Sequence, residues 1–538
     1  MSTRKLVYAK SRIPPHMTTV SSLITANLSL GSLSLNSIGS TVSASKLVTE
    51  ETAATPESST VVTISQAGAA SPLPEYSTSP TNESTARTLT QANNSNDSIT
   101  MAMAGDVLSA SLTNNKFYGL GSALLERFKT TGDDFSQSVQ IAPANPVSSI
   151  GQTVQGSQAD IRLTIQTKSG VEVDITFHSQ DGGLTVGVKS NGKLTDAERS
   201  ALAKLSGSFQ DAIDGLSALP PRLNLSGLTQ FDPSVLSSVD LQSSVPVKGQ
   251  PLQSIDFHAD SAARTVSVIG PTGAMKISVD MSNSAIWGNQ AQRTGAINQY
   301  LSQFDKTSSR GHGDASLMTM FKDAFTQMNS DYGVPSQQIP GTIYATSLGD
   351  ADHAMLTGLA DFNASITQAP AEANPMRLNE QDTFSYQVSQ HTNIKGSELY
   401  GTISQNQRSH LAASYHISLS AGAPLALTSM RSSQNYYYMQ INDAAASTTY
   451  IASRNGELTD ASFNQTADQS TRQSKYVMGR LVSDTIAPSE TSQSKDLLAL
   501  LKPFLESDKP KSQGDIYLWQ QTLSDVHNLV LPQPDSSA

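Results

Sequence analysis

The sequence predicts an α+β protein: an antiparallel β-meander with packed helices, then a second β-rich domain and C-terminal helices, all behind a long disordered N-terminal region. Short segments of alternating apolar and polar residues follow one another, joined by turns that contain Gly or Asn. Amphipathic helical segments come in groups and do not alternate with single strands. The first hundred residues lack the apolar periodicity that a core needs.

The N-terminal segment is rich in Ser and Thr and contains no acidic residue from Met1 to Thr49. We therefore predict that residues 1–115 form a disordered leader. The apolar run Leu6–Ala9 is too short for the core of a signal peptide, so a cleaved secretory signal is not expected. Two interpretations stay open: an uncleaved bacterial export signal that is read unfolded, or an ordinary disordered tail.

The body is predicted to begin with a helix and linker at residues 116–158, because Leu120, Leu124 and Phe128 fall at helical spacing. An α+β domain follows at residues 159–345. Its meander is predicted from the alternating segments Asp160–Gln166, Val171–Phe177 and Leu184–Val188.

Thr195 and Glu198 form a capping box, which predicts the start of a long helix. After this helix, further strands and two helices complete the domain. The strands are predicted at Ser254–Phe257, Thr265–Ile269 and Met275–Val279, and the helices at Trp287–Phe304 and Leu317–Met328.

Residues 346–480 are predicted to be a β-rich domain with a leading helix that starts at Asp350 and carries Leu356, Leu359 and Phe362. Strands are predicted around Tyr386 and from Leu411 to Leu419. Tyr436–Ile441 and Thr448–Ala452 flank Asn442-Asp443 like the arms of a hairpin. Residues 481–538 are predicted to form C-terminal helices, at Asp496–Leu505 and Gly514–Val526.

One heptapeptide, Asn191–Ala197, recurs as Asn455–Ala461 with a single difference, Lys193 against Glu457. Each copy follows a predicted strand. A duplicated strand-turn-helix unit would explain the repeat. Independent use of a favourable Asn-Gly turn and Thr cap would explain it as well.

Composition excludes several classes of chemistry. The chain has no Cys, so disulfides, thiolate nucleophiles and thiolate metal sites are absent. Charged residues make up 15% of the chain, the net charge is −11, and Lys and Arg form no run, so nucleic acid is not an expected partner. No apolar stretch reaches the length of a membrane span, so no integral membrane segment is expected.

Arg310-Gly-His312-Gly-Asp314 is the first candidate catalytic cluster. Glycines around His312 make a flexible loop before a helix, and an imidazole beside the Asp314 carboxylate is able to act as a base. Asp314 is equally an ordinary N-cap for the helix that follows. Both interpretations remain open, and a catalytic role for His312 and Asp314 is a prediction.

Asp350, Asp352 and His353 are candidate ligands for zinc or manganese, since two carboxylates and an imidazole lie within four residues. Acidic residues are also expected in the first turn of a helix for electrostatic reasons. Gly119-Leu-Gly121 resembles a dinucleotide fingerprint only superficially, because Leu124 stands where the third glycine belongs. No cofactor is therefore expected.

Two stretches, Leu120–Val139 and Leu194–Leu225, resemble a proteobacterial protein family of unknown function. The first contains Leu124-Leu-Glu-Arg-Phe-Lys-Thr-Thr-Gly-Asp-Asp-Phe135, and the second ends in Leu219-Pro-Pro-Arg-Leu-Asn-Leu225. The resemblance covers the middle third of the chain. It implies a bacterial origin and assigns no activity or site residue.

These observations favour a bacterial secreted or surface-associated protein that works by binding, without catalytic activity. A secreted effector hydrolase is the first alternative, with a site near His312/Asp314 or near Asp350/Asp352/His353. An intracellular structural protein is the second. Whether the chain is an enzyme, and which protein or surface it binds, is left open by the sequence.

Overall fold

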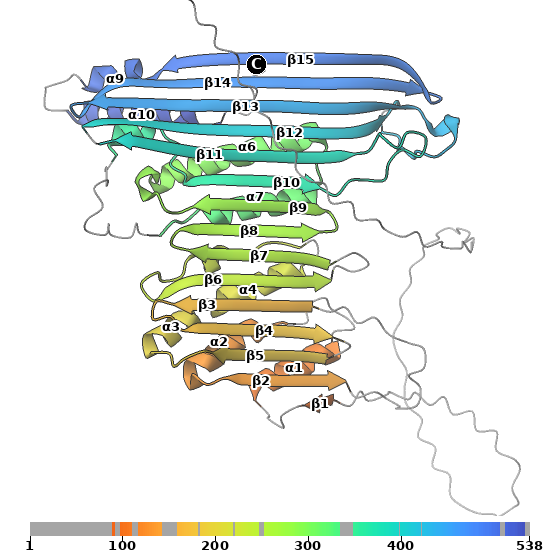
Figure 1. Ribbon diagram of the computed structural model, residues 1–538, viewed down its shortest axis with the longest axis vertical. Coiled ribbons are helices and arrows are strands. Elements are labelled where there is room, and N and C mark those ends of the chain that lie inside the picture. Colours follow the sequence, from red (N-terminus) through yellow and green to blue (C-terminus); the bar gives the residue numbers. More distant parts are fainter. Residues whose placement is uncertain are drawn as a thin grey trace, which may run out of the picture. The chain divides into compact units, whose positions relative to one another are not determined.

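One antiparallel sheet of fifteen strands organises the part of the chain that the computed structural model describes (Figure 1). The described residues are 89–91, 97–109, 117–141, 159–180, 183–218, 221–246, 252–333, 348–397, 399–420, 422–505 and 512–532. Contacts divide the chain into two units, Met1–Thr81 and Asn82–Ala538, and all described residues belong to the second.

The strands run in the order β1-β2-β5-β4-β3-β6 and then consecutively from β6 to β15. Their bounds are β1 Leu89–Gln91, β2 Phe135–Ile141, β3 Ala159–Thr167, β4 Glu172–Gln180, β5 Gly183–Ser190, β6 Leu236–Pro246, β7 Leu252–Asp260, β8 Ala263–Gly270, β9 Gly273–Asp280, β10 Asp361–Gln368, β11 Thr383–Gly396, β12 Tyr400–Ser418, β13 Tyr436–Arg454, β14 Glu457–Val477 and β15 Arg480–Asp496.

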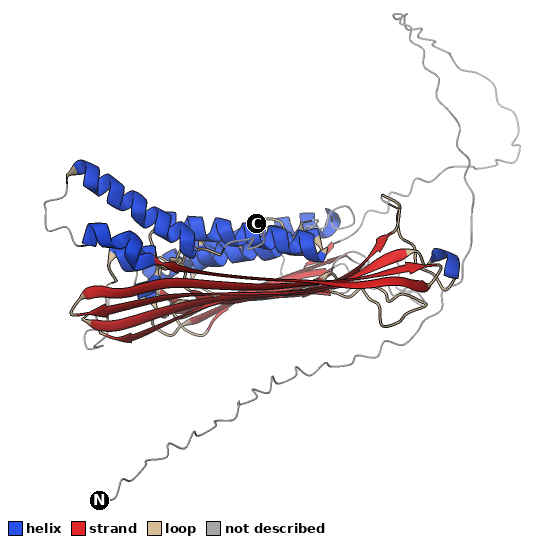
Figure 2. Ribbon diagram, turned by 90° about the horizontal axis from the view of Figure 1, so that it is seen from above, coloured by secondary structure: helices blue, strands red, loops and turns tan. Residues whose placement is uncertain are grey.

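The long helices lie on one face of this sheet (Figure 2). The helix bounds are α1 Ser98–Ser109, α2 Leu120–Thr131, α3 Asp196–Lys204, α4 Ser206–Ser217, α5 Ser226–Thr229, α6 Gln290–Gly311, α7 Ala315–Asn329, α8 Asp350–Ala354, α9 Leu497–Leu505 and α10 Gln513–Val530. We call the opposite face of the sheet the open face.

Period-two alternation explains why the helices gather on one side. In β9, Met275, Ile277 and Val279 are buried, while Lys276 and Asp280 between and beyond them are exposed. The same alternation recurs from strand to strand and places apolar side chains under the helices. The open face therefore carries the more polar half of most strands.

Aromatic side chains from α6, α7, β10 and β11 pack against one another and hold the helix layer against the sheet. Phe304 of α6 and Phe325 of α7 are fully buried, with ring centroids 5.1 Å apart. Phe325 also lies 5.1 Å from Phe362 of β10, and Phe304 lies 5.9 Å from Tyr386 of β11. Edge-on and tilted aromatic pairs of this kind add to the energy of burial. A second core cluster joins α9 and α10 to the inner sides of β12, β13 and β14.

The α+β class and the antiparallel meander predicted from the sequence are present, as is the capping box of Thr195 and Glu198 at the start of α3. The predicted divisions at residues 158/159, 345/346 and 480/481 all fall within the one sheet unit. Strand β1 and helix α1 also lie inside the segment expected to be a leader, and Ile99 and Met103 of α1 are buried in the core.

The hairpin predicted around Asn442-Asp443 is wrong, because both residues lie within the continuous strand β13. Their polar side chains have partners: Asn442 Oδ1 lies 2.9 Å from His410 Nε2, and Asp443 Oδ1 accepts a 2.9 Å bond from Arg310 Nη2. The actual turn is at Asn455-Gly456, where both residues adopt positive φ.

Two further predictions about local structure are corrected. The helix that starts at Asp350 ends at Ala354, since Gly358 is left-handed at φ 77° and the Thr357 amide donates to Gln405 Oε1 at 2.9 Å; Phe362 belongs to β10. The second heptapeptide copy forms the β13–β14 turn and the start of β14 rather than a helix, so the repeat is not a duplicated strand-turn-helix unit.

Candidate functional site: a groove on the open sheet face

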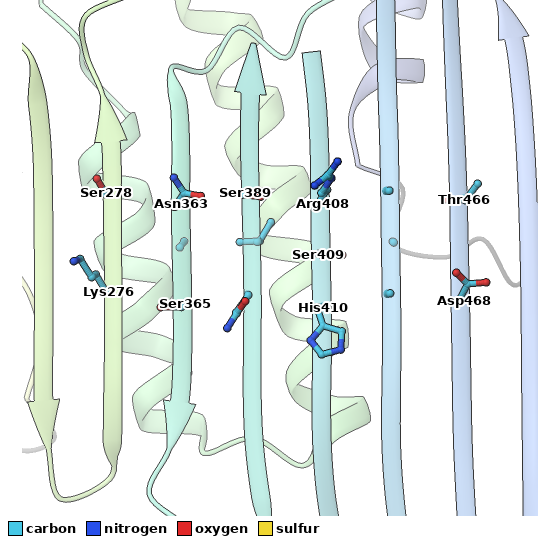
Figure 3. A pocket seen from close by; sticks show the side chains of 16 residues that line it. Lys276, Ser278, Asn363, Ser365, Ser389, Arg408, Ser409, His410, Thr466 and Asp468 are labelled. Atoms are coloured by element: carbon cyan, nitrogen blue, oxygen red, sulfur yellow. The ribbon is translucent and has the colours of Figure 1, made fainter. Parts of the chain in front are cut away.

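The open face is hollowed over strands β9 to β14, in a groove with a volume of about 590 Å³ (Figure 3). In this view the helices lie behind the sheet, and the labelled side chains of Lys276, Arg408, His410 and Asp468 rise from three different strands, β9, β12 and β14. The groove therefore crosses the strands instead of following one of them.

The strand register lines up the groove residues in two straight rows, one side chain per strand. The first row is Lys276, Ser365, Gln387, His410, Ala444, Asp468 and, on β15, Glu490. The second row is Ser278, Asn363, Ser389, Arg408, Ala446, Thr466 and, on β15, Ser492. Neighbouring positions in a row are about 4.8 Å apart, the spacing of paired strands.

Alanines on β13 make the groove deep. Ala444 and Ala446 have only a methyl group on this face, whereas their cross-strand neighbours on β12 and β14 have long or polar side chains. Arg408 and Thr466 flank Ala446, and His410 and Asp468 flank Ala444. A small residue between two larger ones in the same register row leaves a hollow over β13, which deepens the groove there.

Two cations and one carboxylate in the groove have no ion pair and no side-chain hydrogen bond with any described residue. These are Lys276 on β9, Arg408 on β12 and Asp468 on β14, and all three are exposed. Two arginines elsewhere on the open face are paired, Arg162 with Asp174 and Arg472 with Asp484. The unpaired charges of the groove are thus available to a ligand.

The remaining lining consists mainly of hydroxyl and amide side chains, at Ser278, Asn363, Ser365, Gln387 and Thr466. These groups donate and accept hydrogen bonds without a charge. His410 and Asp468 stand on strands separated by β13, about 9.6 Å apart by strand spacing, which is too far for a direct hydrogen bond. The groove therefore offers hydrogen-bond donors and acceptors together with the charges of Lys276, Arg408 and Asp468.

Two segments, residues 369–382 and 422–435, cover the open face where β12 ends and β13 begins. We call the contact between these segments and the two strands the latch. Tyr436 donates to Glu380 Oε2 at 2.5 Å and accepts from Asn374 Nδ2 at 2.8 Å. His416 Nδ1 lies 2.6 Å from Asp382 Oδ1, and its Nε2 lies 3.5 Å from Glu380 Oε2. The latch pins these segments over β12 and β13.

Electrostatics in the latch favours the charged forms. Burial lowers the pKa of His416, but the hydrogen bonds and charges of Asp382 and Glu380 outweigh it, so this pKa is raised. Burial raises the pKa of Glu380, but bonds from His416 and Tyr436, with others nearby, bring it below its ordinary value.

The two residues predicted as catalytic, His312 and Asp314, cap the ends of helices. His312 ends α6 in the left-handed conformation and its ring stacks on Tyr415 at 3.9 Å. Asp314 caps α7 by accepting from the Leu317 amide at 2.7 Å. Neither residue lines the groove.

The residues predicted as metal ligands lie in the short helix α8. Asp352 Oδ2 accepts from the Gly349 amide at 3.1 Å, and Asp350 is exposed. Burial raises the pKa of Asp352 and lowers that of His353. Within the described ranges, no three His, Asp or Glu side chains gather as a metal site would require.

The structure does not bring the two predicted clusters together. His312 follows the last residue of α6, whereas the carbonyl of His353 accepts a 3.2 Å bond from Gln292 near the first residue of the same helix. The intervening turns of α6 span about 30 Å. A shared catalytic pocket would require these loops to converge.

Sequence reasoning missed the groove because its residues belong to six strands whose register is set only by folding. One local signal was present: Ala444, Ala445 and Ala446 are three consecutive small residues in the middle of a strand. Alanine is depleted in strands, so such a run marks a place where side chains must be absent.

Fold and site together define an antiparallel α+β protein with one helix-covered and one open sheet face. Comparison of the chain with protein-family models, with curated proteins and with solved structures finds no match. The resemblance to a proteobacterial family therefore stays a prediction. Among the described helices, none combines the length and apolarity needed to cross a bilayer.

Proposed function

We propose that this chain is a bacterial secreted or surface-associated protein that binds an extended ligand across the open face of its sheet and catalyses no reaction. The observation that carries the proposal is the groove itself: two register rows of polar side chains, crossing β9 to β14, with unpaired charges at Lys276, Arg408 and Asp468. A ligand that lies along these rows contacts several strands at once.

The hydrolase alternative has less support. His312 and His353 are separated by the length of α6, and Asp314 and Asp352 accept hydrogen bonds from helix N-terminal amides. Capping of this kind is the ordinary role of such residues. The proposal that the protein is exported is supported by composition alone, namely by the absence of Cys and the acid-free segment Met1–Thr49.

We expect the variant Ala446→Trp to lose binding to the surface of the producing cells by tenfold or more. An indole at this position fills the hollow between Arg408 and Thr466 while leaving the helix-covered core untouched. The measurement is the cell-bound fraction of labelled full-length protein as a function of its concentration. Ser254→Trp, on β7 of the same face but outside the groove, is the matched control and should bind like the parent protein.

A second groove variant, Thr466→Trp, is tested as well, so that the conclusion does not depend on the folding of Ala446→Trp alone. Circular dichroism should give the same spectrum for all variants, because the substituted side chains are exposed. Undiminished binding of both groove variants would rule out the groove as the binding surface. Absence of cell binding by the parent protein would rule out a surface-associated function.

A further inference from the structure

We infer that the ligand of the groove is an acidic polysaccharide, a hydroxyl-rich chain that carries carboxylates, with Arg408 and Lys276 as its anion-binding residues. This inference rests on the proposed function and specifies its ligand. Four features of the groove support it: unpaired cations, the distance between them, an uncharged polar lining and a floor without free backbone groups.

The first feature is charge that the fold leaves unneutralised. Arg408 has Ser389 and Ala446 as its direct cross-strand neighbours, and His410 and Asn406 on its own strand. None of these is an acid. A guanidinium surrounded in this way is free to form a bidentate pair with a ligand carboxylate.

Lys276 is placed in the same way on β9. Its cross-strand neighbours are Ser267 and Ser365, so it also has no adjacent acid. Three strand spacings separate β9 from β12, and the two cations are also offset by two residues along the strands, so their backbone positions are about 16 Å apart. The ligand must therefore carry at least two anionic groups on an extended backbone, which describes a polymer rather than a small anion.

Between the two cations the lining is uncharged and polar. Asn363, Ser365, Gln387 and Ser389 lie there, on β10 and β11. Hydroxyl and amide side chains pair with ligand hydroxyls as both donors and acceptors. The same stretch of groove exposes no large apolar side chain, since Ala364 and Val388 are buried in the core on the helix-covered side.

The floor of the groove argues against an extended peptide. Strands β9 to β14 each have a neighbour on both sides, so their backbone N–H and C=O groups are already used within the sheet. A peptide adds to a sheet at its edge, through main-chain hydrogen bonds that a sheet face does not offer. A sugar chain has no such requirement, because its own hydroxyls make the contacts.

At the other end of the first row, Asp468 and Glu490 are negative and would repel a carboxylate. Anionic groups of the ligand are therefore confined to β9–β12, while Asp468 accepts hydrogen bonds from hydroxyls. The asymmetry gives the bound chain a direction across the sheet.

The test uses full-length protein and polygalacturonate oligosaccharides as the probe, with binding measured by titration calorimetry at low and at high salt. We expect the double variant Lys276→Gln/Arg408→Gln to bind at least about a hundredfold more weakly, because each charged hydrogen-bond donor is worth about tenfold. The matched control is Lys189→Gln/Arg454→Gln, which removes the same charges at exposed positions outside the groove and should bind as the parent protein does.

Two further probes are titrated in the same way: dextran, a neutral sugar chain, and polyglutamate, an acidic peptide. The inference predicts no binding of dextran and, at most, salt-sensitive weak binding of polyglutamate. It is overturned if polygalacturonate does not bind, if the double variant binds it undiminished, or if dextran or polyglutamate binds as tightly. In these cases the loss of cell binding by Ala446→Trp would still stand, so failure of the ligand class and failure of the groove are distinguishable.

Discussion

Replacing Phe325 by alanine should lower the free energy of unfolding by about 3–5 kcal/mol, the cost of removing a fully buried phenylalanine and leaving a cavity. Phe325 is 0% exposed, and its ring lies between 5.1 and 5.4 Å from those of Phe304, Phe362 and Tyr300. These rings hold α6 and α7 against β10. The loss is therefore expected to weaken the whole helix-covered face.

Urea unfolding followed by circular dichroism measures this effect. Phe504→Ala in α9 is the control, because that ring is only partly buried and its ring contact is with Trp519. We expect it to cost about 1 kcal/mol, in proportion to the apolar area it removes from water. Equal losses for Phe325→Ala and Phe504→Ala would show that the helix layer is not anchored by the aromatic cluster.

Removing the charge of Glu380 in the latch should have the second largest effect on the free energy of unfolding. Glu380→Gln should cost about 3 kcal/mol near pH 5.5, because it removes the buried negative charge that faces His416 Nε2 and accepts from Tyr436. Glu380 and His416 side chains are 5% and 6% exposed, so solvent screens them little. Glu372→Gln, an exposed acid of the same segment, is the control and should be close to neutral.

The latch also makes a prediction about pH. Because the folded pKa of Glu380 lies below its ordinary value of 4.5, its contribution is full above that pH and is lost as pH falls through the folded pKa. Because the folded pKa of His416 lies above 6.5, its contribution is full below 6.5 and is lost as pH rises through the folded pKa. The parent protein should therefore gain most from the latch between pH 4.5 and 6.5.

Unfolding curves at pH about 5.5 and about 8.5 measure the histidine part of this window. The difference between the parent protein and His416→Gln should shrink at the higher pH. An unchanged difference would mean that His416 is neutral in the folded protein and that the latch is held by its uncharged hydrogen bonds alone.

The sequence predicted local structure well where one face of an element is apolar. The strands of the first meander, α2, α6, α7, α9 and α10 all have a clear period, and all are present. Strand β15 was missed because its seventeen residues are nearly all exposed, so no apolar alternation marks it. Strand β13 was divided in two because Asn442 and Asp443 resemble a turn until Arg310 and His410 are placed beside them.

The candidate site was beyond sequence reasoning for a different reason. His312, Asp314 and His353 were predicted as site residues because titratable residues lie close together in the chain. In the structure this closeness reflects the ends of helices, where such residues act as caps. Lys276, Arg408 and Asp468 are far apart in the chain and meet through the register of six strands. Register follows from the pairing of whole strands, which no single segment encodes.

Histidine footprinting tests the central claim, that the groove is the surface that binds. Diethylpyrocarbonate modifies exposed imidazoles, and His410 lies in the groove while His178 lies on β4 of the same sheet face, outside it. Full-length protein would be treated free and bound to the surface of the producing cells. The account predicts that binding slows modification of His410 several-fold and leaves His178 unchanged. Equal modification of His410 in the free and bound protein would contradict it.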